Sequence, residues 1–242
     1  MKAVVLAGGT GSRLMPLTKV TNKHLLPIGD RPMIFHSLEK IKETGISEVM
    51  IVTGVEHIGD IIKLIGSGDE FDLNITYRVQ DKPDGIAGAL ALAKNFIGDS
   101  KFVVILGDNI FKDSINEYVE RFNSIEEGSC MLILKEVDNP SRFGVATVNN
   151  NSIVKIVEKP KVPESNLCVT GIYFFDHLVF DKISSLNMSQ RGEFEISDIN
   201  QMYVDLNKCY FDIFKNWWTD AGTINSYNAA CQMYWGNDSD LI

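Results

Sequence analysis

The segment KAVVLAGGTGSRL, residues 2–14, decides the fold. Its first six residues, Lys2 to Ala7, are almost all apolar, which predicts a short strand buried inside a sheet. Three glycines follow directly, so the strand ends in a loop whose backbone N–H groups can approach phosphate oxygens closely. Arg13 adds a guanidinium that can hold such oxygens at two points. In parallel sheets, ligands bind beyond the carboxyl ends of the strands, where this loop lies.

The spacing of this loop, G-G-x-G-x-R, differs from two common phosphate-binding motifs. No G-K-[ST] ends the loop, so it is not a Walker A motif, and the G-x-G-x-x-G spacing of NAD-dependent oxidoreductases is absent. Short glycine motifs on their own more often mark a tight turn beside a surface arginine. The loop therefore has to be interpreted together with the rest of the chain.

Strand and helix patterns alternate through the first half of the chain. Strands are predicted at 49–52, 75–79 and 102–106, and helices between 30 and 45, over 58–65, from 85 to about 96, and over 115–122. The second half is richer in strands, at 131–137, 144–148, 153–157 and 169–175, with helices near 178–186 and 196–206. The alternation predicts a largely parallel sheet covered by helices on both faces, and residues 1–242 contain no low-complexity linker, so we expect one domain.

Composition excludes several classes of protein. Apolar residues make up 45% of the 242 residues and charged residues 23%, as in a soluble globular protein, and the net charge of −9 argues against a nucleic-acid partner. No apolar run approaches the roughly 20 residues that span a bilayer, and no signal peptide opens the chain. The four cysteines are scattered, so we expect reduced thiols, no structural zinc and a cytoplasmic location.

Seven further segments widen the context of the loop. They are NKHLLPIGDRPMI (22–34), QDKPDGIAGAL (80–90), LGDNIF (106–111), PSRFGVATV (140–148), IVEKPKVPESNLCVTGIYFFD (156–176), GEFEISDIN (192–200) and WWTDAGT (217–223). With LAGGTGSRLMPLT, and in this order over almost the whole chain, they resemble the sugar nucleotidyltransferases. These enzymes join a sugar 1-phosphate to a nucleoside triphosphate and release pyrophosphate. The resemblance implies a three-layer αβα sandwich with a Rossmann-like, predominantly parallel mixed sheet, and, within the family, dTTP and glucose 1-phosphate as substrates.

The resemblance assigns one set of residues to the nucleotide. They are Leu6, Gly8, Gly9, Thr10, Gly11 and Ser12 of the loop, and Gln80, Pro83, Asp84 and Gly85 of the QDKPDG turn. Arg13 and Lys23 are implied as catalytic cations on the reacting phosphates. The Gln80 amide offers a donor and an acceptor, which match the imide edge of thymine or uracil. Spacing alone leaves Lys23 open as a solvated loop lysine and the QDKPDG turn as a helix cap.

A second set of residues is assigned by resemblance to the sugar phosphate. They are Asn109, Gly144, Glu158, Lys159, Val169, Tyr173 and Trp218. Glu158 can accept hydrogen bonds from sugar hydroxyls, and Lys159, the third catalytic cation, can hold the phosphate of the sugar. The alternatives are a solvated Glu-Lys pair and a core tryptophan.

The resemblance also implies Mg²⁺ as cofactor, bound by Asp108 and Asp220. Carboxylate oxygens suit Mg²⁺, which binds one or two of them and keeps several waters. On its own, Asp108 could equally belong to an Asp-Asn turn. The attacking group is a phosphate oxygen that is already ionised, so no general base is needed, and catalysis should come from positioning and charge neutralisation. We therefore interpret the four histidines as structural.

The chain departs from the family pattern in a few places. Gly88 stands where a glutamine is frequent, which puts nucleotide selectivity in question, and the C-terminal helical segment of longer relatives, implicated in allosteric control, is not matched. We therefore expect a short form with altered or absent feedback regulation, and a homo-oligomer, a tetramer by resemblance. Two alternatives stay open: transfer with another nucleotide (UTP or CTP) or sugar, and a non-catalytic sugar-nucleotide sensor.

Overall fold

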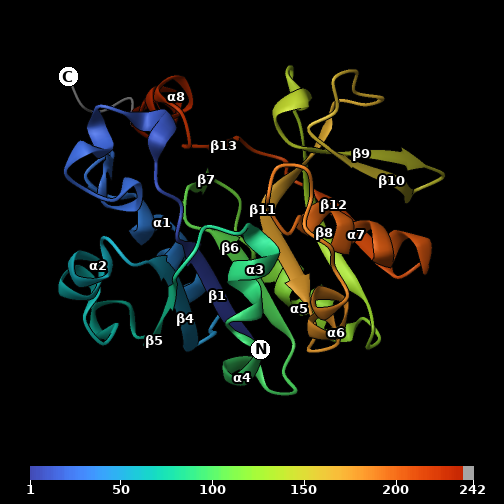
Figure 1. Ribbon diagram of the computed structural model, residues 1–242, viewed down its shortest axis with the longest axis horizontal. Coiled ribbons are helices and arrows are strands. Elements are labelled where there is room, and N and C mark those ends of the chain that lie inside the picture. The colour runs from blue at the N-terminus through green and yellow to red at the C-terminus, as the bar shows by residue number, and fades with distance from the viewer. Residues whose placement is uncertain (237–242) are drawn as a thin grey trace.

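The apolar segment at the start of the chain forms the central strand of the sheet. In the computed structural model, which describes residues 1–236, β1 (Lys2–Ala7) pairs in parallel with β4 (Glu48–Gly54) on one side and β6 (Phe102–Leu106) on the other. A further parallel strand, β5 (Asn74–Gln80), pairs with β4. These four strands form one parallel block of a nine-stranded sheet (Figure 1).

The second half of the chain adds antiparallel pairing, which makes the sheet mixed. The strand β11 (Leu167–Phe175) runs antiparallel to both β6 and β8 (Cys130–Glu136), and β8 pairs in parallel with β12 (Cys209–Ile213). A hairpin of β9 (Gly144–Asn149) and β10 (Ser152–Glu158) joins β11 through Cys168. The register of β11 shifts between Val169 and Tyr173, close to a buried glycine described below.

Helices cover both faces of the sheet because alternate residues of each strand point to opposite sides. Ala3 and Val5 face a core beneath one set of helices, and Val4 and Leu6 face a core beneath the other. The first set is α1 (Met33–Lys42), α2 (Ile58–Ile65) and α5 (Asn116–Ser124); the second is α3 (Ile86–Ala91), α4 (Lys94–Ile97), α6 (Val179–Ser184) and α7 (Ile196–Asp205). The predicted three-layer αβα arrangement is confirmed.

Several elements differ from the expectation. The helix predicted from 85 to about 96 is two helices, α3 and α4, and β12 was not predicted. A two-stranded sheet of β7 (Asn109–Phe111) and β13 (Trp218–Asp220), followed by α8 (Ile224–Trp235), was also not predicted. A small hairpin, β2 (Pro27–Ile28) and β3 (Arg31–Pro32), packs against α8. Short 3₁₀ turns lie at 12–14, 17–19, 23–25, 69–71 and 140–142.

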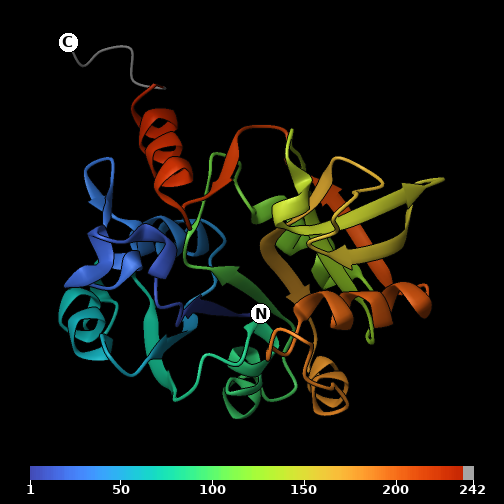
Figure 2. The same ribbon diagram turned by 45° about the horizontal axis from the view of Figure 1, so that its top comes forward.

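The strands of the two halves of the chain lie on opposite sides of β1 and β6, whereas α8, near the end of the described residues, packs against β2 of the first half. In Figure 2 the segments coloured blue to cyan lie to the left of β1 and β6, and those coloured yellow to orange lie to the right. The carboxyl ends of β1 and β6 therefore lie between these two groups of strands. None of the helices within residues 1–236 combines the length and apolar character needed to cross a bilayer.

Candidate active site

Two adjoining cavities lie at the carboxyl ends of β1 and β6. We call one the loop cavity, because the glycine-rich loop and the QDKPDG turn line it, and the other the strand cavity, because β9, β10 and β11 line it. The two share five lining residues: Arg13, Ile86, Leu106, Asp108 and Lys159. The cavities are therefore two parts of one continuous cleft, and three of the predicted charged residues stand at their junction.

The predicted residues divide between these cavities as follows. The loop cavity is lined by Leu6, Gly8, Gly9, Arg13, Lys23, Gln80, Pro83 and Gly85, and Thr10 lines a hollow beside it. The strand cavity is lined by Asn109, Gly144, Glu158, Lys159, Val169, Tyr173, Trp218 and Asp220, with Arg13 and Asp108 shared. Gly11, Ser12 and Asp84 line neither of these cavities.

Three charged side chains meet around Gly222 at the centre of the cleft. A Cβ atom added to Gly222 would lie 3.2 Å from Arg13 Nη2, 3.3 Å from Asp220 Oδ2 and 3.4 Å from Asp108 Oδ2. These residues are distant in sequence: the unpredicted sheet of β7 and β13 brings Asp220 beside Asp108, and Arg13 follows β1, which pairs with β6. The backbone N–H of Ala221 donates to the carbonyl of Asp108 at 2.7 Å, which fixes the two acidic segments to each other.

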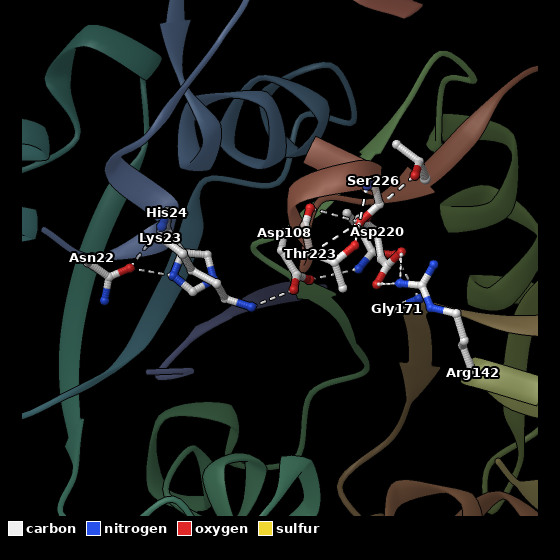
Figure 3. Close-up of polar contacts among 11 residues, drawn as sticks. Asn22, Lys23, His24, Asp108, Arg142, Gly171, Asp220, Thr223 and Ser226 are labelled. Atoms are coloured by element: carbon white, nitrogen blue, oxygen red, sulfur yellow. Dashed lines mark hydrogen bonds and ion pairs between the residues drawn. The ribbon is translucent and has the colours of Figure 1, made fainter. Parts of the chain in front are cut away.

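The start of α8 holds this junction in place. Thr223 is the N-cap of α8, and its side chain and that of Ser226 form a capping box, which satisfies backbone N–H groups at the helix start. Figure 3 shows this pair beside Asp220. Because the cap directly follows Gly222, the glycine and Asp220 are fixed at the junction.

Asp108 is paired with a cation. Lys23 Nζ lies 2.5 Å from its Oδ2 (Figure 3), and Asn109 Nδ2 donates to its Oδ1 at 3.1 Å. Burial acts to raise the pKa of Asp108, but the charges of Lys23 and its neighbours outweigh burial and lower that pKa to about 2. Asp108 is therefore ionised over the whole physiological range.

Asp220 has the opposite electrostatic balance. Burial and the negative charge of Asp108 raise the pKa of Asp220 to about 6, although Arg142 Nη2 lies 3.3 Å from its carboxylate and opposes the shift. A carboxylate destabilised by a second carboxylate gains from a cation held between them. No third His, Cys, Asp or Glu joins them within residues 1–236. The pair therefore fits Mg²⁺, which takes few carboxylates and leaves positions for water and phosphate oxygens.

Arg13 is exposed and unpaired. Its side chain makes no hydrogen bond or ion pair among the described residues, although it stands beside two carboxylates. A guanidinium without an internal partner is ready to take an anion, since its planar fork matches two phosphate oxygens. The geometry thus agrees with the phosphate-binding interpretation of the loop.

His24 is structural in this arrangement. Its Nδ1 lies 2.7 Å from Asn22 Oδ1, and the same oxygen accepts its backbone N–H at 2.8 Å. Burial lowers the pKa of His24 to about 3, with a contribution from the charge of Lys23, so the ring is neutral. The Asn22 cap fixes the 3₁₀ turn that directs Lys23 toward Asp108 (Figure 3).

The Gln80 amide has only one orientation that satisfies its neighbours. Its Nε2 lies 2.7 Å from Asp84 Oδ1 and 3.3 Å from the carbonyl of Gly85, and both partners only accept hydrogen bonds. Nε2 therefore faces them, and Oε1 is left beside Gly8. Of the donor and acceptor predicted for base recognition, the acceptor is the one that stays available.

Gly88 is explained by the position of Asp84. A Cβ atom on Gly88 would lie 2.2 Å from Asp84 Oδ1, so a larger residue would displace this carboxylate. The glycine that departs from the family pattern therefore makes room for the side chain that orients Gln80.

Glu158 is the polar centre of the strand cavity. Its carboxylate accepts from Ser197 Oγ at 2.5 Å and lies within 3.3 Å of Lys159 Nζ and 3.4 Å of Arg191 Nη1. A Cβ on Gly144 would lie 3.0 Å from the Ser197 hydroxyl, so a larger residue there would crowd this pair. Glu158 is thus fixed in position and keeps lone pairs for a ligand.

Asn109 and Trp218 support each other at the back of the cavity. Asn109 Oδ1 accepts from Trp218 Nε1 at 2.7 Å and from the backbone N–H of Gly171 at 2.9 Å. A Cβ on Gly171 would lie 2.5 Å from Asn109 Nδ2, which explains the glycine inside β11. The Asn109 carbonyl is fully used within the protein, so the residue can offer a ligand only its remaining N–H.

Sequence reasoning missed several residues that line the cleft. They are Ile86, Arg142, Arg191, Glu193, Ser197 and Asn200. All except Arg191 lie inside the quoted motifs, and Arg191 directly precedes one, but ordinary residue types on a helix or loop carry no signal of their own. Only the fold shows that they face the cavities.

Comparison with known proteins gives a consistent result. The family model for nucleotidyl transferases matches residues 2–235. A low-salt glycan biosynthesis nucleotidyltransferase of Haloferax volcanii is 41% identical over 92% of this chain, which spans 62% of that protein's length. A glucose-1-phosphate thymidylyltransferase of Neisseria meningitidis is 37% identical over 95% of this chain and 81% of its own length.

Solved structures show the same kinship. A candidate glucose-1-phosphate thymidylyltransferase from Bacillus anthracis, in complex with sucrose, has a TM-score of 0.93 and 52% identity over 96% of this chain and 94% of that one. A UDP-glucose pyrophosphorylase complexed with UDP-glucose, 24% identical, has a TM-score of 0.83 over 98% of each chain and shows the shared fold. The chain therefore belongs to the nucleotidyl transferase family, among the glucose-1-phosphate thymidylyltransferases, as its motifs predicted.

Proposed function

We propose that this protein transfers a thymidylyl group from dTTP to glucose 1-phosphate and releases pyrophosphate. The observation that carries the proposal is the convergence of Arg13, Asp108 and Asp220 around Gly222, where the loop cavity meets the strand cavity. A nucleotide in the loop cavity and a sugar phosphate in the strand cavity would place their phosphates at this junction. The reaction is an in-line attack of a sugar-phosphate oxygen on the α-phosphorus, with pyrophosphate leaving from the opposite side.

The main obstacle to this reaction is the repulsion between the triphosphate and the sugar phosphate. The cations at the junction reduce this repulsion. Arg13, free of internal partners, holds the triphosphate and takes up the charge that develops on the leaving pyrophosphate. Lys159, shared by both cavities, neutralises the phosphate of the sugar. Lys23 holds Asp108 in place and brings a second positive charge to the loop cavity. Catalysis then rests on positioning and charge neutralisation rather than on a general base.

Asp108 and Asp220 are the residues that would hold Mg²⁺. A bound Mg²⁺ would supply Lewis-acid polarisation of phosphoryl oxygens and help to align the reacting groups. The raised pKa of Asp220 supports this assignment, because a cation relieves the repulsion from Asp108 that causes part of the shift.

The choice of base rests on Gln80. With Nε2 held by Asp84 and Gly85, Oε1 presents an acceptor to the loop cavity. The imide N–H of thymine or uracil donates to such an acceptor, whereas the ring nitrogen of cytosine at that position is itself an acceptor and is rejected. Thymine and uracil differ by one methyl group, which is worth roughly 1–3 kcal/mol in an apolar pocket. We therefore expect dTTP first, UTP second and CTP far behind.

Product analysis tests the proposal. Incubation with dTTP, glucose 1-phosphate and Mg²⁺ should give dTDP-glucose and pyrophosphate in equal amounts, and chelation with EDTA should stop the reaction until Mg²⁺ is restored. A nucleotide that binds without turnover, with every sugar 1-phosphate tried, would favour the sensor instead. Arg13, Lys23, Asp108 and Asp220 together count against a sensor, since binding alone does not require groups that hold a metal and stabilise a leaving group.

A further inference from the structure

Helix α7 carries two polar side chains that are fully buried and lack partners. Asn200 and Tyr203 are both 0% exposed, and neither the Asn200 amide (Nδ2 and Oδ1) nor the Tyr203 hydroxyl has a hydrogen-bond partner among residues 1–236. Buried polar groups are nearly always hydrogen-bonded, because an unpaired one keeps its full desolvation cost. Each of the two therefore requires an explanation.

Only one of these two residues faces the cleft. Asn200 lines the strand cavity, one helical turn after Ile196 and Ser197, which line it as well. Tyr203 does not line this cavity; it packs on Phe175 and lies under the ammonium group of Lys182. Asn200 thus stands in the wall of the proposed sugar site, and its covered amide there keeps an unpaired donor and acceptor.

Neighbouring hydroxyl groups make no hydrogen bond with the Asn200 amide, and two of them direct their only proton elsewhere. The Ser197 hydroxyl donates to Glu158, and the Thr170 hydroxyl, also in the cavity wall, donates to the carbonyl of Ile133 at 2.7 Å. The amide has no contact with bulk solvent either, because its Nδ2 and Oδ1 atoms are both buried. A partner has to come from the cavity.

We infer that Asn200 recognises one hydroxyl group of the sugar. This inference rests on the proposed function, which places a sugar 1-phosphate in the strand cavity. An alcohol complements an amide fully, because it can donate to Oδ1 and accept from Nδ2. A phosphate could take the donor only and would face Oδ1 with negative charge. Asn200 therefore selects a neutral hydroxyl, while Glu158, which can only accept, takes another.

The test combines protein variants with substrate analogues. Pyrophosphate release is measured with glucose 1-phosphate and its 2-, 3-, 4- and 6-deoxy analogues, for the wild type, Asn200→Leu and Asn200→Ala. We expect either variant to raise the KM for glucose 1-phosphate about 10- to 100-fold, with the KM for dTTP unchanged. For one deoxy analogue, the KM of the wild type should be raised by the same factor relative to glucose 1-phosphate, whereas the KM of the variants should rise no further.

Tyr203→Phe is the matched control, because it removes an equally buried and unpaired polar atom from the same helix but outside the cavity. It should leave the KM for glucose 1-phosphate unchanged. Thermal melting provides a second readout: Asn200→Leu should melt at the same or a higher temperature, since it removes an unsatisfied amide. Asn200→Ala serves if the leucine variant does not fold.

The outcomes separate this inference from the proposed function. Wild-type turnover combined with an unchanged KM in both Asn200 variants would overturn the inference alone. Two other results would also overturn the inference: an equal further loss of activity of the Asn200 variants with every deoxy analogue, or a lower melting temperature of these variants with an unchanged KM. In either case the amide would act through a structural water. A wild type that is inactive with every sugar 1-phosphate would overturn both.

Discussion

The loop cavity and the strand cavity meet at Asp108 but are built differently. The loop cavity is formed largely by one contiguous segment and one turn, and its principal cation, Arg13, has no internal partner. The strand cavity is assembled from side chains of several strands and α7, and most of its polar groups are already paired, with Glu158 held by three neighbours. The first is suited to a polyanion, because the positive charge of Arg13 has no partner within the described residues. The second is suited to an uncharged ring held by directed hydrogen bonds.

The same contrast separates the two carboxylates at the junction. Asp108 forms a close ion pair with Lys23, at 2.5 Å. Asp220 forms a longer one with Arg142, at 3.3 Å. The pKa of one is lowered to about 2 and that of the other raised to about 6. The junction thus combines a permanent charge with one that a cation would stabilise.

The largest expected effect comes from removing the free cation of the loop cavity. Arg13→Gln should lower kcat by roughly 10³-fold, as loss of an arginine that stabilises a transferring phosphoryl group does elsewhere. The melting temperature should stay the same, because Arg13 is exposed and unpaired. Lys19→Ala, at an exposed lysine outside both cavities, is the control for a general loss of positive charge. A loss below tenfold would remove Arg13 from the phosphate site.

Neutralising the two carboxylates should separate activity from stability. Asp108→Asn and Asp220→Asn should each lower kcat by roughly 10²- to 10³-fold, the size of losing one preorganised electrostatic group. Their effects on stability at pH 8 should be opposite. Asp220→Asn should raise the free energy of unfolding by about 2 kcal/mol, and Asp108→Asn should lower it, since Lys23 loses its partner.

The pH dependence of these stability differences follows from the pKa shifts. The pKa of Asp220 is higher in the folded than in the unfolded state, so its destabilising contribution grows as pH rises from about 4 to 6. The pKa of Asp108 is lower in the folded state, so its stabilising contribution is lost as pH falls from about 4 to 2. Urea unfolding at pH 5 and pH 8 checks the contribution of Asp220: the increase in the free energy of unfolding caused by Asp220→Asn should be smaller at pH 5 than at pH 8. A gain that grows at pH 5 would contradict the assignment.

A smaller effect is expected from filling the junction itself. Gly222→Ala places a Cβ atom 3.2–3.4 Å from Arg13, Asp220 and Asp108, so these side chains must move by a few tenths of an ångström. We expect kcat to fall roughly tenfold with little change in either KM, because misplacing groups at the reacting centre costs rate more than binding. Gly59→Ala, where nothing lies within 4 Å of the added atom, is the matched control.

The smallest effect should appear in nucleotide selectivity. Asp84→Asn can donate to Gln80 as well as accept from it, so the Gln80 amide is no longer restricted to one orientation. The preference for dTTP over CTP should then fall a few-fold to tenfold, with kcat for dTTP nearly unchanged. Competition assays with both nucleotides measure this ratio. An unchanged ratio would mean that Asp84 does not control the orientation of Gln80.

The two cavities also differ in how far the sequence predicts them. Residues 6–14 are contiguous, and their composition alone indicates a loop after a buried strand. The helix and strand periods predicted the three layers in the same way. The junction was harder: β13 is only three residues long, and its pairing with β7 joins positions more than a hundred residues apart. The roles of Gly222, Gly171 and Gly88 depend on which side chain lies opposite each glycine, and Asn200 stands out only because the fold leaves its amide without a partner.

The account's central claim is thymidylyl transfer to glucose 1-phosphate at this junction, and pyrophosphate release tests it most directly. The rate should be measured with glucose 1-phosphate and Mg²⁺ against dTTP, UTP, CTP, ATP and GTP in turn. The account predicts the fastest release with dTTP, slower release with UTP, and rates near background with CTP and the two purine nucleotides. A preference for CTP or a purine, or release from no nucleotide at all, would contradict it.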